Sequence, residues 1–97
     1  MLSASQIKYL KSLQVKKYRK REKKIFLEGS NLIYEALMAN YPINTIWYHE
    51  NQINDKIIEL AKSKFIKIDC TSKKSIDQIS ETIHHQGIIA LANILVK

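Results

Sequence analysis

The fold of this chain is decided by the stretch KKYRKREKKIFLEG, residues 16–29. Seven of its first nine residues are Lys or Arg, and three apolar residues, 25–27, follow them directly. Such an apolar run predicts a short strand over 25–28, which must pack into a core. The strand therefore fixes the basic run at one edge of a folded body, where it can meet a polyphosphate backbone.

Length and composition predict one small globular domain. The 97 residues are 45% hydrophobic and 26% charged, with a formal net charge of +7. This is ordinary for a globular chain, and too short for a second sizeable core. Residues 1–24 carry nine Lys/Arg and one Glu, a net of +8, whereas residues 25–97 carry seven Lys/Arg and eight Asp/Glu, a net of −1. Because the positive charge is N-terminal, it favours a nucleic-acid partner bound by that part of the chain.

The cysteine content and the N-terminus indicate the compartment. The single cysteine, Cys70, excludes an internal disulfide and indicates a reducing environment. We expect it to be inert packing at the end of a strand. The N-terminus has no apolar core of a signal peptide, and no apolar run is long enough to cross a membrane. We therefore expect a cytoplasmic protein with no membrane partner.

Apolar periodicity alternates between helical and extended patterns along the chain. The expected helices span 6–16, 31–40, 55–63 and 73–80, and the expected strands span 25–28, 43–48, 65–69 and 88–96. Ser5, Asn54 and either Thr71 or Ser72 are the candidate helix caps. The nearly continuous apolar run after Gly87 is typical of a strand covered on both faces. The alternation predicts an α/β fold, a small three-layer α/β/α sandwich around a mixed sheet.

The basic N-terminal residues and the turn after the first strand are the candidate RNA contacts. Tyr18 can stack on an unpaired base or cover the strand edge, and both interpretations remain open. Gly29 permits positive φ before a helix whose N-terminus favours an anion, although a plain strand–helix turn would use the same residue. The candidate RNA-binding residues are Lys8, Lys11, Lys16, Lys17, Tyr18, Arg19, Lys20, Arg21, Lys23, Lys24, Glu28, Gly29 and Asn31.

The sequence offers no convincing catalytic or metal centre. Glu28 and Glu35 are seven residues apart across a turn, which gives no argument for an acid–base pair. His84 and His85 are adjacent and project in different directions, and with His49 they do not form a zinc set at ligand spacing. No glycine-rich dinucleotide fingerprint, phosphate loop or Ser/Cys–His constellation is present. We therefore expect no catalytic residue, cofactor or metal in residues 1–97.

Four segments in order carry a family resemblance: KKYR (16–19), FLEG (26–29), LIYEAL (32–37) and HQGIIA (85–90). Together they resemble the N-terminal substrate-binding domain of the SpoU/TrmH family of RNA 2′-O-ribose methyltransferases, over essentially the whole chain. The resemblance implies a small α/β/α domain similar to kink-turn-binding ribosomal proteins. It also implies that this domain holds RNA, with rRNA as the expected substrate.

The same resemblance places the chemistry elsewhere. It implies a separate C-terminal catalytic domain, a knotted methyltransferase of the SPOUT class, expected after residue 97. That domain would bind S-adenosylmethionine and supply the catalytic residues, so residues 1–97 alone would neither bind the cofactor nor methylate RNA. We expect the full-length parent to be a homodimer.

Two alternatives remain open from the sequence. One is a stand-alone kink-turn RNA-binding protein of the ribosomal-protein type, because Gly29-Ser30-Asn31 looks like the Gly-x-Asn of those proteins. However, Leu32 and Glu35 stand where that family has Glu and Lys. Leu32 cannot accept a hydrogen bond from a base, and Glu35 would repel phosphate. The other alternative is a protein-interaction domain with no RNA role.

Overall fold

The computed structural model describes residues 2–49, 55–80 and 87–94. The elements are α1 (Ala4–Ser12), α2 (Lys16–Glu22), β1 (Lys24–Glu28), α3 (Ser30–Met38), β2 (Ile43–Tyr48), α4 (Asp55–Ser63), β3 (Lys67–Cys70), α5 (Lys73–Ile79) and β4 (Ile88–Asn93). The strands form one sheet in the order β1-β4-β2-β3. Strand β4 is antiparallel to β1 and to β2, while β2 is parallel to β3. The predicted mixed sheet is therefore confirmed.

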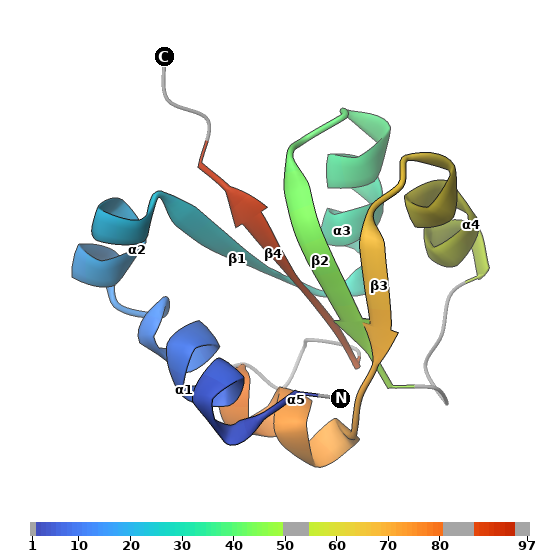
Figure 1. The fold of residues 1–97 in the computed structure, drawn as a ribbon. Coiled ribbons are helices and arrows are strands. Elements are labelled where there is room, and N and C mark those ends of the chain that lie inside the picture. The colour runs from blue at the N-terminus through green and yellow to red at the C-terminus, as the bar shows by residue number, and fades with distance from the viewer. Residues whose placement is uncertain (1, 50–54, 81–86, 95–97) are drawn as a thin grey trace.

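Helices cover both faces of this sheet, which confirms the three-layer α/β/α arrangement (Figure 1). Helices α3 and α4 lie on one face and α1 and α5 on the other. Neighbouring residues of β4 point to opposite faces: Ile88 and Ala90 join the α3–α4 core, and Ile89 joins the α1–α5 core. The last strand is thus covered on both faces, as its apolar run predicted. The helix residues buried against the sheet are Ile33, Leu37, Ile57 and Ala61 on one face, and Leu10, Leu13, Ile76 and Ile79 on the other.

The N-terminal region differs from the prediction of one helix over 6–16. Ser3, not Ser5, caps α1: its Oγ accepts from the Gln6 backbone N–H at 3.1 Å, and the Gln6 side chain accepts from the Ser3 N–H at 2.8 Å. This capping box starts the helix two residues earlier than expected. The helix then ends at Ser12, and the basic run forms its own helix, α2.

The third strand and Cys70 also differ from the prediction. Strand β3 begins at Lys67, because Phe65 adopts a left-handed conformation with φ of 58° at the end of α4. Cys70 is exposed, so the expectation that it is packed in the core is wrong. It is the last residue of an edge strand, where the sheet has a neighbour on one side only.

The other boundaries agree closely. The bounds of α4 and β2 match the prediction, and Ser72 is the cap of α5, accepting from the Ser75 N–H at 3.1 Å. The start of β1 and the ends of α3, α5 and β4 differ by one to three residues. The predicted cap Asn54 lies outside the described residues. Within the described ranges, no helix is long and apolar enough to span a bilayer.

Candidate nucleic-acid interface

Arg19 fixes the basic helix α2 onto the end of α1. Its Nη1 donates to the carbonyl oxygens of Leu13 at 3.0 Å and Gln14 at 2.8 Å, and the side chain is half-buried. These carbonyls lie just past the C-terminus of α1, where backbone acceptors lack helical partners. A charged donor that satisfies two of them is a strong, orienting contact. The guanidinium of Arg19 thus holds the two helices together.

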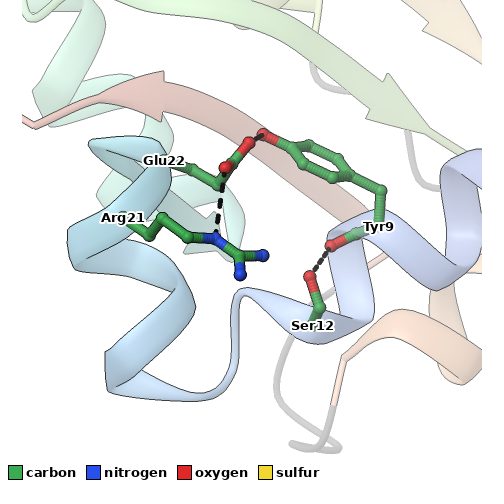
Figure 2. Close-up of polar contacts among 4 residues, drawn as sticks. All are labelled: Tyr9, Ser12, Arg21 and Glu22. Atoms are coloured by element: carbon green, nitrogen blue, oxygen red, sulfur yellow. Dashed lines mark hydrogen bonds and ion pairs between the residues drawn. The ribbon is translucent and has the colours of Figure 1, made fainter.

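A second contact joins the same helices, as Figure 2 shows. The Tyr9 hydroxyl on α1 donates to Glu22 Oε1 on α2 at 3.3 Å, and Glu22 Oε2 lies 3.6 Å from Arg21 Nε. The pKa of Tyr9 is raised by its partial burial and then by the charge and hydrogen bond of Glu22. Because the contact is largely exposed, its contribution to stability is small. It sets the side-chain positions of Tyr9, Glu22 and Arg21 at the surface.

Tyr18 lies among cations of its own helix. Its ring is half-buried, with the Arg21 guanidinium 4.6 Å and the Lys17 Nζ 5.9 Å from the ring centroid. Both distances fall in the range of cation–π contacts. The ring therefore helps to hold Lys17 and Arg21, and its predicted stacking on a base stays a prediction.

Seven of the nine predicted basic contacts are exposed on α1, α2 and the residue after α2. Among the residues that the structure describes, Arg21 is the only one of them with an ion pair. Their positive charge is therefore largely uncompensated at the surface, which attracts an anionic partner. We call these seven residues the basic corner: Lys8, Lys11, Lys16, Lys17, Lys20, Arg21 and Lys23.

The other two predicted basic contacts, Arg19 and Lys24, are half-buried and bonded within the domain. Lys24 Nζ donates to Asn93 Oδ1 and, at 3.2 Å, to Asn44 Oδ1. These bonds join β1 to its neighbour β4 and to β2, the next strand along, at one end of the sheet. Arg19 therefore holds α2 on the end of α1, and Lys24 links the strands at the end of the sheet where α2 leads into β1.

The predicted contacts Glu28, Gly29 and Asn31 lie at the other end of β1, separated from α2 by the length of that strand (Figure 1). A strand of five residues spans about 16 Å. Gly29 is buried at φ of 95°, and its N–H donates to the Ile88 carbonyl at 3.1 Å. Asn31 is exposed beside a hollow of about 300 Å³. The structure thus does not bring Gly29 and Asn31 to the basic corner, and Glu28 approaches it only through Gln14, in the turn between α1 and α2.

Glu28 is engaged inside the domain. Its Oε1 accepts from Gln14 Nε2 at 3.3 Å, and the same Nε2 donates to the Ile79 carbonyl at 3.2 Å. Glu35 lies on the exposed side of α3 and lines the hollow with Asn31. The two carboxylates therefore belong to different environments.

Sequence reasoning missed Tyr9, Gln14 and Glu22, the residues that position the corner. Tyr9 meets Glu22 across 13 residues, and Gln14 meets Glu28 across 14, so no local period reveals either pair. The one available signal was Glu22 itself, a single acid among seven bases.

No group of three or more His, Cys, Asp and Glu side chains is placed to hold a metal ion in the described ranges 2–49, 55–80 and 87–94. His84 and His85, which were weighed as ligands, lie outside these ranges.

The chain is similar in sequence to known proteins. Residues 26–95 match the family described as RNA 2′-O ribose methyltransferase substrate binding. The chain is similar to the putative TrmH family tRNA/rRNA methyltransferase YacO of Bacillus subtilis, with 32% identity over 68 residues. That match covers 67% of this chain and 27% of the relative.

Solved structures share the fold. A crystal structure of an AdoMet-bound rRNA methyltransferase from Sinorhizobium meliloti matches with a TM-score of 0.77 at 19% identity, covering 100% of this chain and 37% of that one. A crystal structure of an RNA 2′-O ribose methyltransferase matches with a TM-score of 0.80 at 22% identity, covering 98% of this chain and 36% of that one. The structure of a putative RNA methyltransferase of the TrmH family from Porphyromonas gingivalis matches with a TM-score of 0.75 at 24% identity, covering 100% of this chain and 37% of that one. The chain therefore spans less than two fifths of each of these proteins.

Proposed function

Because the chain belongs to the family of RNA 2′-O-ribose methyltransferase substrate-binding domains, we propose that the basic corner is the surface with which it holds RNA. The resemblance to the SpoU/TrmH family that the sequence indicated is confirmed by the family match and by the TrmH-family relative. The stand-alone kink-turn protein is not favoured.

The observation that carries the proposal is the way the corner is built. Six exposed cations sit on two short helices and a seventh directly follows the second helix. Arg19 and the Tyr9–Glu22 contact join these two helices. The charges are therefore fixed relative to one another and to the sheet. Contacts of Lys and Arg with phosphates set the register and orientation of a nucleic acid without reading its sequence. A substrate-binding domain must fix the register and orientation of its RNA in this way.

The whole protein's activity is part of the same proposal. We infer that the chain is one domain of an S-adenosylmethionine-dependent RNA 2′-O-methyltransferase, with rRNA as substrate. The similar protein from Sinorhizobium meliloti is described as AdoMet-bound, and the present chain covers 37% of it. The cofactor and the catalytic residues would lie in a knotted domain after residue 97, in a homodimeric cytoplasmic parent. Residues 1–97 alone should then show no saturable S-adenosylmethionine binding by calorimetry, and saturable binding would contradict this division of labour.

Holding the RNA would serve catalysis by positioning. A ribose hydroxyl is a poor nucleophile, and fixing it in line with a methyl donor removes several kcal/mol of the barrier. A tethered RNA-binding domain also raises the local concentration of RNA at the cofactor. Loss of the corner should therefore lower kcat/KM at subsaturating RNA more than it lowers kcat.

The test replaces Lys16, Lys17 and Lys20 together with Gln. All three are exposed, and Arg19 is left intact because it holds the helices together. Each phosphate contact contributes a factor of about 5 to 8 in affinity at 0.1 M salt, if the electrostatic part vanishes near 1 M. The triple variant should therefore bind rRNA fragments about 100- to 500-fold more weakly than the parent, whatever their sequence.

The matched control replaces three exposed lysines outside the corner, Lys56, Lys73 and Lys74, with Gln. It removes the same net charge from α4 and α5, so a general effect of net charge would weaken both variants equally. We expect the control to stay within about threefold of the parent. Equal affinities of the two triple variants would refute the basic corner as the RNA surface.

A further inference from the structure

Phe65 combines two features that the stability of the fold does not explain. Its side chain is 97% exposed, and its backbone is left-handed, with φ of 58°. The Phe65 N–H donates to the Lys62 carbonyl at 3.1 Å, and the Ile66 N–H donates to the Ala61 carbonyl at 2.9 Å. This is the arrangement with which helices end in a left-handed residue, usually glycine or asparagine. A bulky aromatic residue there is an outlier.

Helix α3 of the same chain ends in the same backbone conformation, but with a residue that commonly adopts it. Asn40 has φ of 56°, its N–H donates to Leu37 O at 3.1 Å, and the Tyr41 N–H donates to Ala36 O at 2.9 Å. Asparagine tolerates this conformation, whereas Phe65 occupies it at a cost and buries no ring surface in return. Strain without a structural benefit is typical of functional sites.

The surroundings of Phe65 are cationic. Lys62 and Lys67 are exposed on either side of it in sequence, and Lys64 donates to the Asn40 side chain. The acid in this segment is Asp69, 3.7 Å from Lys67 Nζ, so residues 62–69 carry three Lys and one Asp, a net of +2. An exposed aromatic ring among lysines is the combination with which proteins bind single-stranded nucleic acid.

The connection from α4 to β3, which contains Phe65, lies at the same end of the sheet as α2 (Figure 1). Strand β1 begins there opposite the end of β4, with Lys24 paired to Asn93, and β3 begins beside β2, with Lys67 paired to Thr45. The order β1-β4-β2-β3 separates β1 from β3 by three strand spacings, about 14 Å. Lys24, Asn93 and Asn44 are hydrogen-bonded across the first two of these spacings. A polar rim therefore runs from Lys24 to β2, one strand spacing from β3, which Phe65 precedes.

We propose that Phe65 stacks on an unpaired base of the RNA whose phosphates the basic corner holds. Lys62 and Lys67 would contact the phosphates beside that base. This rests on the proposed function and adds to it a preference for RNA with an unpaired segment next to the bound region. Stacking does not depend on base identity, since every base has a π-face.

The test measures the affinity of this chain for two RNAs of equal length, a hairpin whose loop carries 2-aminopurine and a fully paired duplex. Phe65→Ala should weaken binding of the hairpin roughly 5- to 150-fold, the range for loss of one base–aromatic stack. It should change binding of the duplex by less than twofold. Phe65→Trp should keep the parent's affinity and quench 2-aminopurine at least as strongly. Leu32→Ala is the matched control, because Leu32 is 47% exposed in the first turn of α3, at the opposite end of the sheet.

The stability of the variants separates a binding role from a folding role. Phe65→Gly relieves the backbone strain, so it should fold at least as stably as the parent while losing hairpin affinity like Phe65→Ala. Hairpin affinity unchanged in Phe65→Ala, with Lys16, Lys17 and Lys20 still required for binding, would overturn the stacking site and leave the proposed function standing. If the parent binds neither RNA, both fail. If Phe65→Ala instead disrupts contact with a protein segment and leaves RNA binding intact, the site is a protein interface and the proposal is wrong.

Discussion

Replacing Arg19 with Gln should destabilise the domain although Arg19 belongs to a surface-charged run. The parent residue donates from one Nη1 to the Leu13 and Gln14 carbonyls at 3.0 and 2.8 Å. The shorter Gln side chain cannot place a donor between both oxygens. The variant therefore leaves two carbonyls at the α1–α2 junction without their protein partner.

The magnitude follows from the number and exposure of these bonds. Hydrogen bonds to charged groups contribute about 1.5–3 kcal/mol each, and water can replace part of that at a half-buried site. We expect a loss of about 2 kcal/mol of unfolding free energy. For a domain of this size, that lowers Tm by roughly 8–16 °C. Arg19→Lys should fall between the parent and Arg19→Gln, because an ammonium lacks the rigid fork of the guanidinium.

The assay is urea unfolding followed by circular dichroism, with Lys20→Gln as the matched control. Lys20 is the exposed neighbour of Arg19, so its replacement should change the unfolding free energy by less than about 0.5 kcal/mol. Lys20→Gln should instead lower the affinity for RNA, because it removes one phosphate contact without removing a contact that stabilises the fold. An Arg19→Gln variant as stable as Lys20→Gln would refute the role of Arg19 in joining the helices.

Two further predictions concern the backbone and the pH dependence. Gly29→Ala should cost about 1–3 kcal/mol, because φ of 95° with ψ of 148° is accessible almost only to glycine; an unchanged urea midpoint would contradict this. The raised pKa of Tyr9 means that the folded state favours the neutral phenol. The stability that this preference contributes is fully present below pH 10.0, the ordinary pKa of tyrosine, and is lost as the pH rises through the pKa of the folded state. The phenolate absorbance of Tyr9, taken as the difference between the parent and Tyr9→Phe titrations, should therefore develop above pH 10.0. Glu22→Gln should shift it back toward 10.0, and a Tyr9 phenolate that develops at or below pH 10.0 in the parent would count against the Tyr9–Glu22 contact.

The sequence predicted the layers and the location of the charge because both depend on local patterns. The apolar period of 57, 58, 60 and 61 gave α4 its bounds, and the β-rich run 43–48 gave β2. The uninterrupted apolar run of β4 indicated a strand buried on both faces, which its place between β1 and β2 explains.

The prediction failed where tertiary contacts or caps override the local pattern. The Ser3–Gln6 capping box started the first helix two residues early, and the turn after Ser12 ended it before residue 16. The basic run formed a helix that was not expected. Phe65 was expected in a strand because aromatic residues favour strands, but the end of α4 uses it as a left-handed cap. The distribution of the predicted contacts over two ends of β1 depends on the fold, which the spacing of Lys24 and Gly29 alone did not reveal.

An NMR titration of the chain with an rRNA fragment is the decisive measurement, because it locates the bound RNA on the surface residue by residue. We expect amide shift changes concentrated on Lys8, Lys11 and Lys16–Lys23, with a second group around Phe65, and both groups should weaken together as salt is raised. Changes confined to the α3–α4 face, with the basic corner unperturbed at saturating RNA, would contradict this expectation.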